Sequence, residues 1–180
     1  VKLCMATDTL EWDLVVAGNW DMLLDALERF ESPTWECLYV LLLWLSSVVL
    51  VPFPLDRGTP SPSERIHRLC ARFLSRPGKE RDAASIVLGR LYAREECELF
   101  FSAFLQDAEQ ATASLVPTGV LQTLCAFVKQ ADASLIRAHY DAMLRVIAHL
   151  RTVDTRNMLV DRYAIKLEGR LAMHDPRDAH

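Results

Sequence analysis

The chain has 180 residues, 51% of them hydrophobic, which is enough to bury the core of one domain or of several stacked repeats. Its 20 Lys and Arg residues against 24 Asp and Glu residues give a formal net charge of −4, which argues against a nucleic-acid-binding protein, because such proteins carry a positive excess. With only 6 Gly and 8 Pro residues, the composition favours long helices.

The residue types that usually carry chemistry are scattered along the chain. The five cysteines are odd in number and widely spaced, which indicates buried thiols in a reducing compartment. The five histidines include no His-Glu-x-x-His pair, and the sequence contains neither a glycine-rich phosphate loop nor a Gly-x-Ser-x-Gly motif. We therefore expect no metal, no cofactor and no enzymatic activity.

The first two predicted helices cover residues 19–30 and 33–51. The second contains the most apolar run of the chain, which raises the alternative of a membrane span. Such a span needs about 20 apolar residues, whereas this run is shorter and contains Ser46 and Ser47. We expect instead that this helix is the most buried one of the chain, with Trp44 and its neighbours Leu41, Leu45 and Val48 in the core.

The clearest helix start is Ser61-Pro62-Ser63-Glu64. It places Ser61 at the N-cap, Pro62 at the first helical position and Glu64 at the capping-box position. The apolar stripe of this third helix consists of Ile66, Leu69, Cys70, Phe73 and Leu74. A fourth helix over residues 78–94 carries small residues that would permit close approach of a neighbouring helix: Ala83, Ser85 and Gly89.

Four more amphipathic helices are predicted over residues 95–110, 116–130, 132–151 and 154–173, which makes about eight in all. Helix pairs that return about every 35 to 45 residues are typical of HEAT and armadillo repeats. We therefore predict an all-α fold, a HEAT- or armadillo-like α-solenoid of antiparallel pairs, with a compact helical bundle as the alternative. Terminal repeats normally need a polar cap, so we expect Ile165, Leu167 and Leu171 to expose apolar surface near the C-terminal end.

Four arginines lie along one side of the third helix at helical spacing: Arg65, Arg68, Arg72 and Arg76. A basic ridge on an acidic chain can steer an acidic protein partner, mainly by raising the association rate. We predict a protein-binding role for this ridge. The alternative is an ordinary solvated face, which keeps the chain soluble.

The densest charge run, Lys79-Glu80-Arg81-Asp82, opens the fourth helix. One interpretation is a first helical turn that faces water and forms weak ion pairs. However, HEAT units often carry an Asp or Arg early in their second helix that bonds to the adjacent repeat. Arg81 and Asp82 are therefore candidates for an inter-repeat ladder.

Two segments carry a family resemblance. In the first, Tyr39-Val-Leu-Leu-Leu-Trp-Leu-Ser46 is followed by Val51-Pro-Phe53, so that an apolar helix with a tryptophan ends in a Pro-Phe corner. The second is the charged heptamer Gly78-Lys-Glu-Arg-Asp-Ala-Ala84, and a basic helix with Lys166 and Arg170 follows later in the chain. In this order the segments resemble the N-terminal HEAT-repeat region of the tubulin-folding cofactor D (tubulin-specific chaperone D) family.

The resemblance implies a non-enzymatic chaperone scaffold that binds β-tubulin after the chaperonin and helps to assemble the αβ-tubulin dimer. It also implies tubulin cofactors C and E and an Arf-like small GTPase as partners, a contribution to GTPase activation of tubulin, and a cytoplasmic, cytoskeleton-associated location. Because family members are several-fold longer, we expect a fragment. The alternative is a generic HEAT-repeat adaptor, such as a transport or trafficking scaffold, without the tubulin function.

The resemblance also divides the chain. Residues 1–180 form a single helical-repeat region, in which residues 1–32 match the family only weakly and residues 33–173 form the helix pairs. Residues 174–180 are expected to be a flexible tail. We expect no nucleic acid and no membrane span among the interactions of this region.

Overall fold

The computed structural model describes residues 20–29, 34–52, 54–56, 59–110, 116–154 and 157–176. Within these residues the chain forms α-helices and two short 3-10 helices, η1 (Glu95–Cys97) and η2 (Ala172–His174), and no strand. The α-helices are α3 (Trp20–Arg29), α4 (Trp35–Val48), α5 (Pro62–Leu74), α6 (Lys79–Tyr92), α7 (Glu98–Gln110), α8 (Pro117–Gln130), α9 (Ala133–Ala138), α10 (Tyr140–Val153) and α11 (Met158–Leu171).

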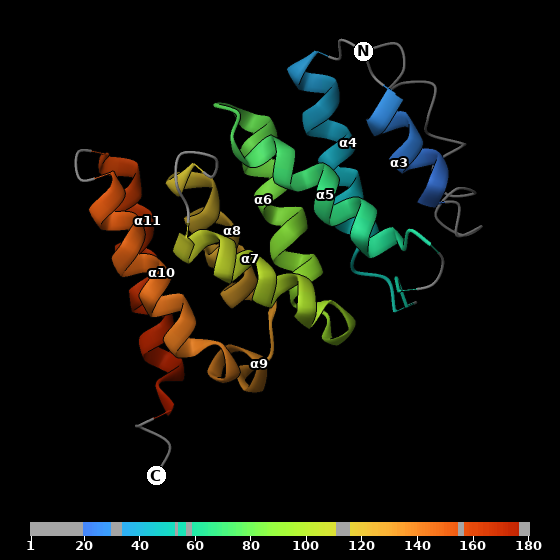
Figure 1. Cartoon of the computed structure of the whole chain (residues 1–180). Coiled ribbons are helices and arrows are strands. Elements are labelled where there is room, and N and C mark those ends of the chain that lie inside the picture. The colour runs from blue at the N-terminus through green and yellow to red at the C-terminus, as the bar shows by residue number, and fades with distance from the viewer. Residues whose placement is uncertain are drawn as a thin grey trace.

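The helices lie in two layers (Figure 1). One layer contains α4, α6, α8 and α11, in which each helix packs extensively on the next. The other layer contains α3, α5, α7 and α10, and successive helices of the chain alternate between the layers. Because α5, α7 and α10 begin at residues 62, 98 and 140, the unit recurs after roughly 40 residues. The chain is therefore an all-α solenoid of the HEAT and armadillo type, as predicted.

Local sequence signals explain where α5 and α6 begin. The Ser61 hydroxyl accepts a hydrogen bond from the backbone N–H of Glu64 at 3.2 Å, and Pro62 opens the helix. This confirms the predicted start. Gly78 precedes α6 with a φ of +140°, a conformation that residues with a Cβ rarely adopt. The glycine therefore permits the sharp turn between the two helices.

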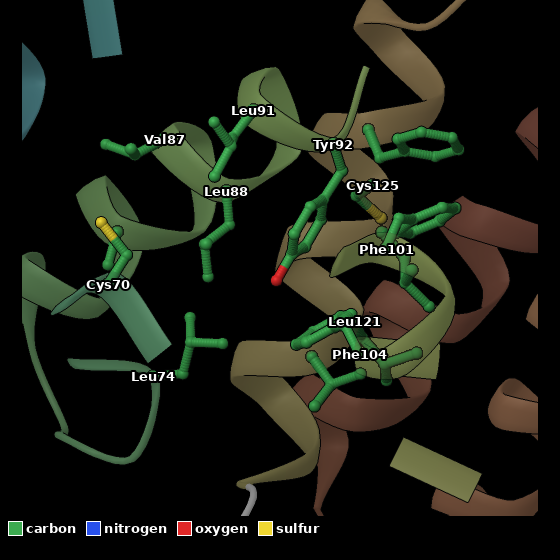
Figure 2. Close-up of a cluster of buried hydrophobic side chains, with 14 of the residues drawn as sticks. Cys70, Leu74, Val87, Leu88, Leu91, Tyr92, Phe101, Phe104, Leu121 and Cys125 are labelled. Carbon is green, nitrogen blue, oxygen red and sulfur yellow. The ribbon is translucent and has the colours of Figure 1, made fainter. Parts of the chain in front are cut away.

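An aromatic cluster joins the two layers in the middle of the solenoid. The fully buried Tyr92 of α6 reaches toward α7, where its ring centroid lies 5.3 Å from Phe101 and 5.2 Å from Phe104 (Figure 2). Phe101 stacks on Phe127 of α8 with 4.0 Å between the ring centroids. Such close aromatic pairs add to the hydrophobic stabilisation and fix the relative positions of α6, α7 and α8.

The prediction that α4 is the most buried helix is wrong. Leu45 and Val48 are buried as predicted, but Trp44 and Leu41 are only half-buried. Val40 and Leu50 are exposed by 45% and 47%. Among the described helices, α4 has one neighbour in its own layer, whereas α6 and α8 each have a neighbour on both sides. The most continuous burial belongs to α8, in which ten of the residues are buried.

The predicted single helix over residues 132–151 is divided into α9 and α10. The break occurs at His139, whose backbone has φ −108° and ψ 9° and lies outside the α region. Its ring meets Phe101 of α7 edge to face at 4.9 Å between centroids, and its Nε2 atom lies 3.5 Å from a carboxylate oxygen of Glu98. These tertiary contacts coincide with the interruption. The other predicted helices each have one counterpart among the described residues.

The prediction of exposed apolar surface near the C-terminal end is confirmed for only one of its three residues. Ile165 is 62% exposed, but Leu167 and Leu171 are fully buried. The two leucines lie on the face of α11 that packs on α8 and α10, and Ile165 lies on the opposite face.

Among the helices that the structure describes, none combines the length and apolar character that a bilayer crossing requires.

Candidate protein-binding surfaces

Arg65, the first member of the predicted basic ridge, is used inside the chain. Its guanidinium lies 2.7 Å from Oδ1 of Asp25 and 2.9 Å from Oε2 of Glu28, both on α3. These hydrogen bonds, above all the one to Glu28, raise the pKa of Arg65 and keep it charged. The side chain is only 14% exposed. Arg65 therefore fastens α3 to α5 and leaves little charge for a partner.

The other three arginines of the ridge are exposed. Arg68 pairs with Glu64 one turn earlier in α5, at 2.5 Å. Arg72 has no carboxylate partner within the part of the chain that the structure describes. Arg76 lies beyond the end of α5, with its guanidinium carbon 5.1 Å from the centre of the Phe73 ring. The predicted ridge is thus reduced to a cluster of Arg68, Arg72 and Arg76, which we call the α5 arginines.

Arg81 and Asp82 of α6 both bond to one residue of α8, the next helix in the same layer. Nε of Arg81 donates to Oε1 of Gln122 on α8 at 3.1 Å, and Nε2 of Gln122 donates to Oδ1 of Asp82 at 2.8 Å. The same Nε2 lies 3.0 Å from the hydroxyl of Tyr163 on α11. The side-chain amide of Gln122 therefore links α6, α8 and α11. Its oxygen and nitrogen both have hydrogen-bond partners, which hold the side chain in one position.

A groove lies across these three helices beside the amide. It has a volume of about 350 Å³. Its lining includes small and apolar side chains, and its polar side chains are those of Asp82, Ser85, Gln122, Lys129, Tyr163, Lys166 and Arg170. The groove therefore combines three cations from α8 and α11 with one carboxylate from α6.

The charges in this groove are unbalanced. Asp82 accepts a hydrogen bond from Gln122 and lies 3.7 Å from Nζ of Lys79, so it already has partners within the chain. Lys129 and Lys166 are exposed, and in the described ranges no carboxylate pairs with either. Arg170 donates to the backbone carbonyl of Cys125 at 2.5 Å, which holds it over the groove without neutralising it. We call this site the cationic groove.

Three of the cysteines that the structure describes, Cys70, Cys97 and Cys125, are buried, whereas Cys37 is only partly buried. Burial raises the pKa of Cys125, which lines the cationic groove, although Arg170 and Lys166 act in the opposite direction. Burial also raises the pKa of Cys97 to about 12 and that of Cys70 still further. These thiols therefore stay protonated, in agreement with the interpretation as buried thiols. In the residues described, no group of His, Cys, Asp and Glu is placed to hold a metal ion.

Comparison with known proteins identifies the family. Residues 19–112, more than half of the chain, match the family model described as "Tubulin-specific chaperone D-like, ARM repeat". The chain belongs to this family. The match covers α3 to α7 and includes the heptamer that opens α6. It confirms the resemblance that the sequence motifs suggested.

A curated relative supports the same assignment. Tubulin-folding cofactor D of Schizosaccharomyces pombe is 29% identical over 108 residues, which cover 57% of this chain and 10% of the relative. The chain therefore spans about a tenth of the length of this relative. No solved structure matches the chain.

Sequence reasoning singled out Arg81 and Asp82 but not Gln122, the residue to which both bond. A glutamine in an apolar helix gives no pairing signal until the neighbouring helix is known. The cationic groove was missed for the same reason, because Lys129 comes from α8 and Lys166 from α11. Only the spacing of Lys166 and Arg170, four residues apart on one helical face, was a usable signal.

Proposed function

We propose that this chain is part of a tubulin-folding cofactor, a non-enzymatic scaffold that binds β-tubulin and supports assembly of the αβ-tubulin dimer after the chaperonin. The observation that carries the proposal is the family match over residues 19–112. The solenoid fold supports it, because stacked helix pairs offer an extended surface suited to a large protein partner. The name of the relative, tubulin-folding cofactor D, agrees with this class.

The proposal extends to the other partners of the folding machinery. Tubulin cofactors C and E and an Arf-like small GTPase are proposed to assemble with the longer protein in the cytoplasm, in association with the cytoskeleton. The chain is proposed to contribute to GTPase activation of tubulin by holding it. The nucleotide would belong to tubulin or to the small GTPase, since the sequence has no phosphate-binding motif of its own.

The α5 arginines are the proposed steering surface for tubulin. Arg68, Arg72 and Arg76 are exposed on a chain whose formal net charge is −4. A local positive surface accelerates encounter with an acidic partner, and this effect is lost as salt screens it. Arg65 is left out of the surface because its ion pairs with α3 are internal.

A capture experiment from cytosol tests the proposal. The 180-residue parent chain and the variant Arg68→Glu/Arg72→Glu/Arg76→Glu are each attached to beads. The cytosolic proteins that each one captures are then identified. We expect enrichment of β-tubulin by the parent chain and weaker capture by the variant. Arg65 is left unchanged in the variant because its replacement by Glu would detach α3. Capture of transport or trafficking cargo without tubulin would instead support the generic adaptor and overturn the proposal.

A further inference from the structure

We propose that the cationic groove across α6, α8 and α11 binds an acidic, extended peptide segment of a partner protein. This inference deepens the proposed function, on which it rests for the class of partner, by naming a second binding site and the chemistry that it recognises. The site is separate from the α5 arginines, which belong to the other layer of the solenoid (Figure 1).

Charge is the first argument. Lys129 and Lys166 are exposed at the groove and have no carboxylate partner in the described ranges, while the only carboxylate of the lining, Asp82, is occupied by Gln122 and Lys79. Arg170 adds a third positive charge, fixed by its bond to a backbone carbonyl. On a chain with a formal net charge of −4, such an unpaired cluster favours an anionic ligand.

Shape is the second argument. Packed helices lie about 10 Å apart, so a groove from α6 over α8 to α11 is about 20 Å long, the length of about six residues of extended chain. Its lining includes apolar surface from Ile86 and Ala126, which suits the aliphatic part of acidic side chains. A peptide that crosses α8 would bring its carboxylates to Lys129 on one side and to Lys166 and Arg170 on the other.

Rigidity is the third argument. Gln122 is 9% exposed and is held by Arg81, Asp82 and Tyr163 at 3.1, 2.8 and 3.0 Å. The wall of the groove is therefore ordered before a ligand arrives, and little conformational entropy is lost on binding. A nucleic acid is disfavoured because three cations would neutralise few phosphates, and the aromatic side chain of the lining, Tyr163, is only partly exposed.

Fluorescence anisotropy with a labelled peptide of eight glutamates tests the proposal directly. The groove variant Lys129→Glu/Lys166→Glu is compared with the control Arg137→Glu/Arg145→Glu, which changes the net charge equally but replaces exposed residues of α9 and α10. We expect the groove variant to lose about tenfold or more in affinity and the control to change by less than about twofold. Arg170 is kept because it bonds to the backbone of α8.

Three outcomes of the direct binding measurements would overturn the proposal. These are no binding of the peptide by the parent chain, an equal loss in both variants, and tighter binding of an oligonucleotide of the same charge. The proposal would also be overturned if inorganic phosphate displaced the peptide when both supply the same total concentration of negative charge. The site would then recognise a small anion. The neutral variant Lys129→Gln/Lys166→Gln, with an intermediate loss expected, keeps the test valid if charge reversal prevents folding.

The same variants separate this inference from the proposed function. If the parent chain captures tubulin and the groove variant captures it equally, with peptide binding unchanged, the groove proposal fails and the tubulin proposal stands. If the parent chain binds the acidic peptide through the groove but captures no tubulin, the groove proposal stands and the tubulin proposal fails.

Discussion

A Cβ atom added to Gly89 on α6 would lie 2.4 Å from the Cβ atom of Ala126 on α8, closer than real Cβ contacts allow. It would also lie 2.7 Å from the backbone nitrogen of Phe127. Because backbone atoms cannot turn aside as a flexible side chain can, the two helices would have to separate. Gly89 therefore sets the close packing of α6 on α8, which carries both the aromatic cluster and the cationic groove.

We predict that Gly89→Ala destabilises the chain by about 1 to 3 kcal/mol, as overpacking of a well-filled contact usually does. The loss exceeds the gain of up to about 1 kcal/mol that alanine gives in a helix interior. Chemical denaturation followed by circular dichroism measures the change. A variant as stable as the parent chain would show that α6 and α8 can move apart without penalty.

Gly169 offers a matched control on α11. An added Cβ atom there meets nothing within 4 Å among the described residues. Gly169→Ala should therefore show the helix propensity alone and stabilise the chain by about 0.5 to 1 kcal/mol. Opposite signs for Gly89→Ala and Gly169→Ala would separate packing from propensity.

His67 gives the fold a predictable pH dependence. Its Nδ1 atom lies 2.9 Å from the hydroxyl of the buried Tyr92, and its ring stacks on Phe100 at 5.4 Å between centroids. Burial lowers the pKa of His67 below the ordinary value of 6.5, although Asp107 acts in the opposite direction. The native chain therefore binds fewer protons at this site than the unfolded chain does.

The sign of the effect follows from proton linkage. The stability contributed by neutral His67 is fully present above pH 6.5 and decreases as the pH falls from there through the lowered folded pKa. We expect the free energy of unfolding to fall between pH 6.5 and pH 5 more steeply for the parent chain than for His67→Gln, which does not titrate. Parallel pH profiles for the two proteins would contradict the assignment.

Arg65 allows a prediction about the first helix. It is bonded to Asp25 and Glu28 of α3, and both carboxylates are about 40% exposed, so the solvent weakens each pair. We expect Arg65→Gln to cost about 1 kcal/mol and to act locally. Hydrogen exchange should accelerate in residues 20–29 and stay unchanged in α8. Uniform acceleration throughout the solenoid would mean that Arg65 supports the whole fold.

Local signals made most of the fold predictable from the sequence. Ser61 and Pro62 fixed the start of α5, and the small side chain of Gly89 correctly indicated a close helix contact. Burial was harder to predict, because Trp44 lies in the most apolar helix yet is only half-buried, and among the described helices α4 has a neighbour in its layer on one side only. The break at His139 was missed for a similar reason, since its contact with Phe101 depends on a helix some forty residues earlier.

The candidate binding surfaces were less predictable than the fold. The spacing of the arginines on α5 placed Arg65 on the same face as Arg68 and Arg72. It gave no indication that the carboxylates of α3 would occupy Arg65. The cationic groove needs Lys129 and Lys166 from two helices, and only the stacking of α8 on α11 brings them together.

Binding of purified tubulin to the immobilised 180-residue chain tests the central claim most directly. Biolayer interferometry at low and moderate salt gives the association rate and the affinity for the same preparation. The proposal predicts saturable binding whose association rate falls with salt and falls again in Arg68→Glu/Arg72→Glu/Arg76→Glu. The proposal would be contradicted if a chain shown to be folded by circular dichroism gave no saturable binding of tubulin. It would also be contradicted if tubulin bound no better than unrelated acidic proteins at the same concentrations.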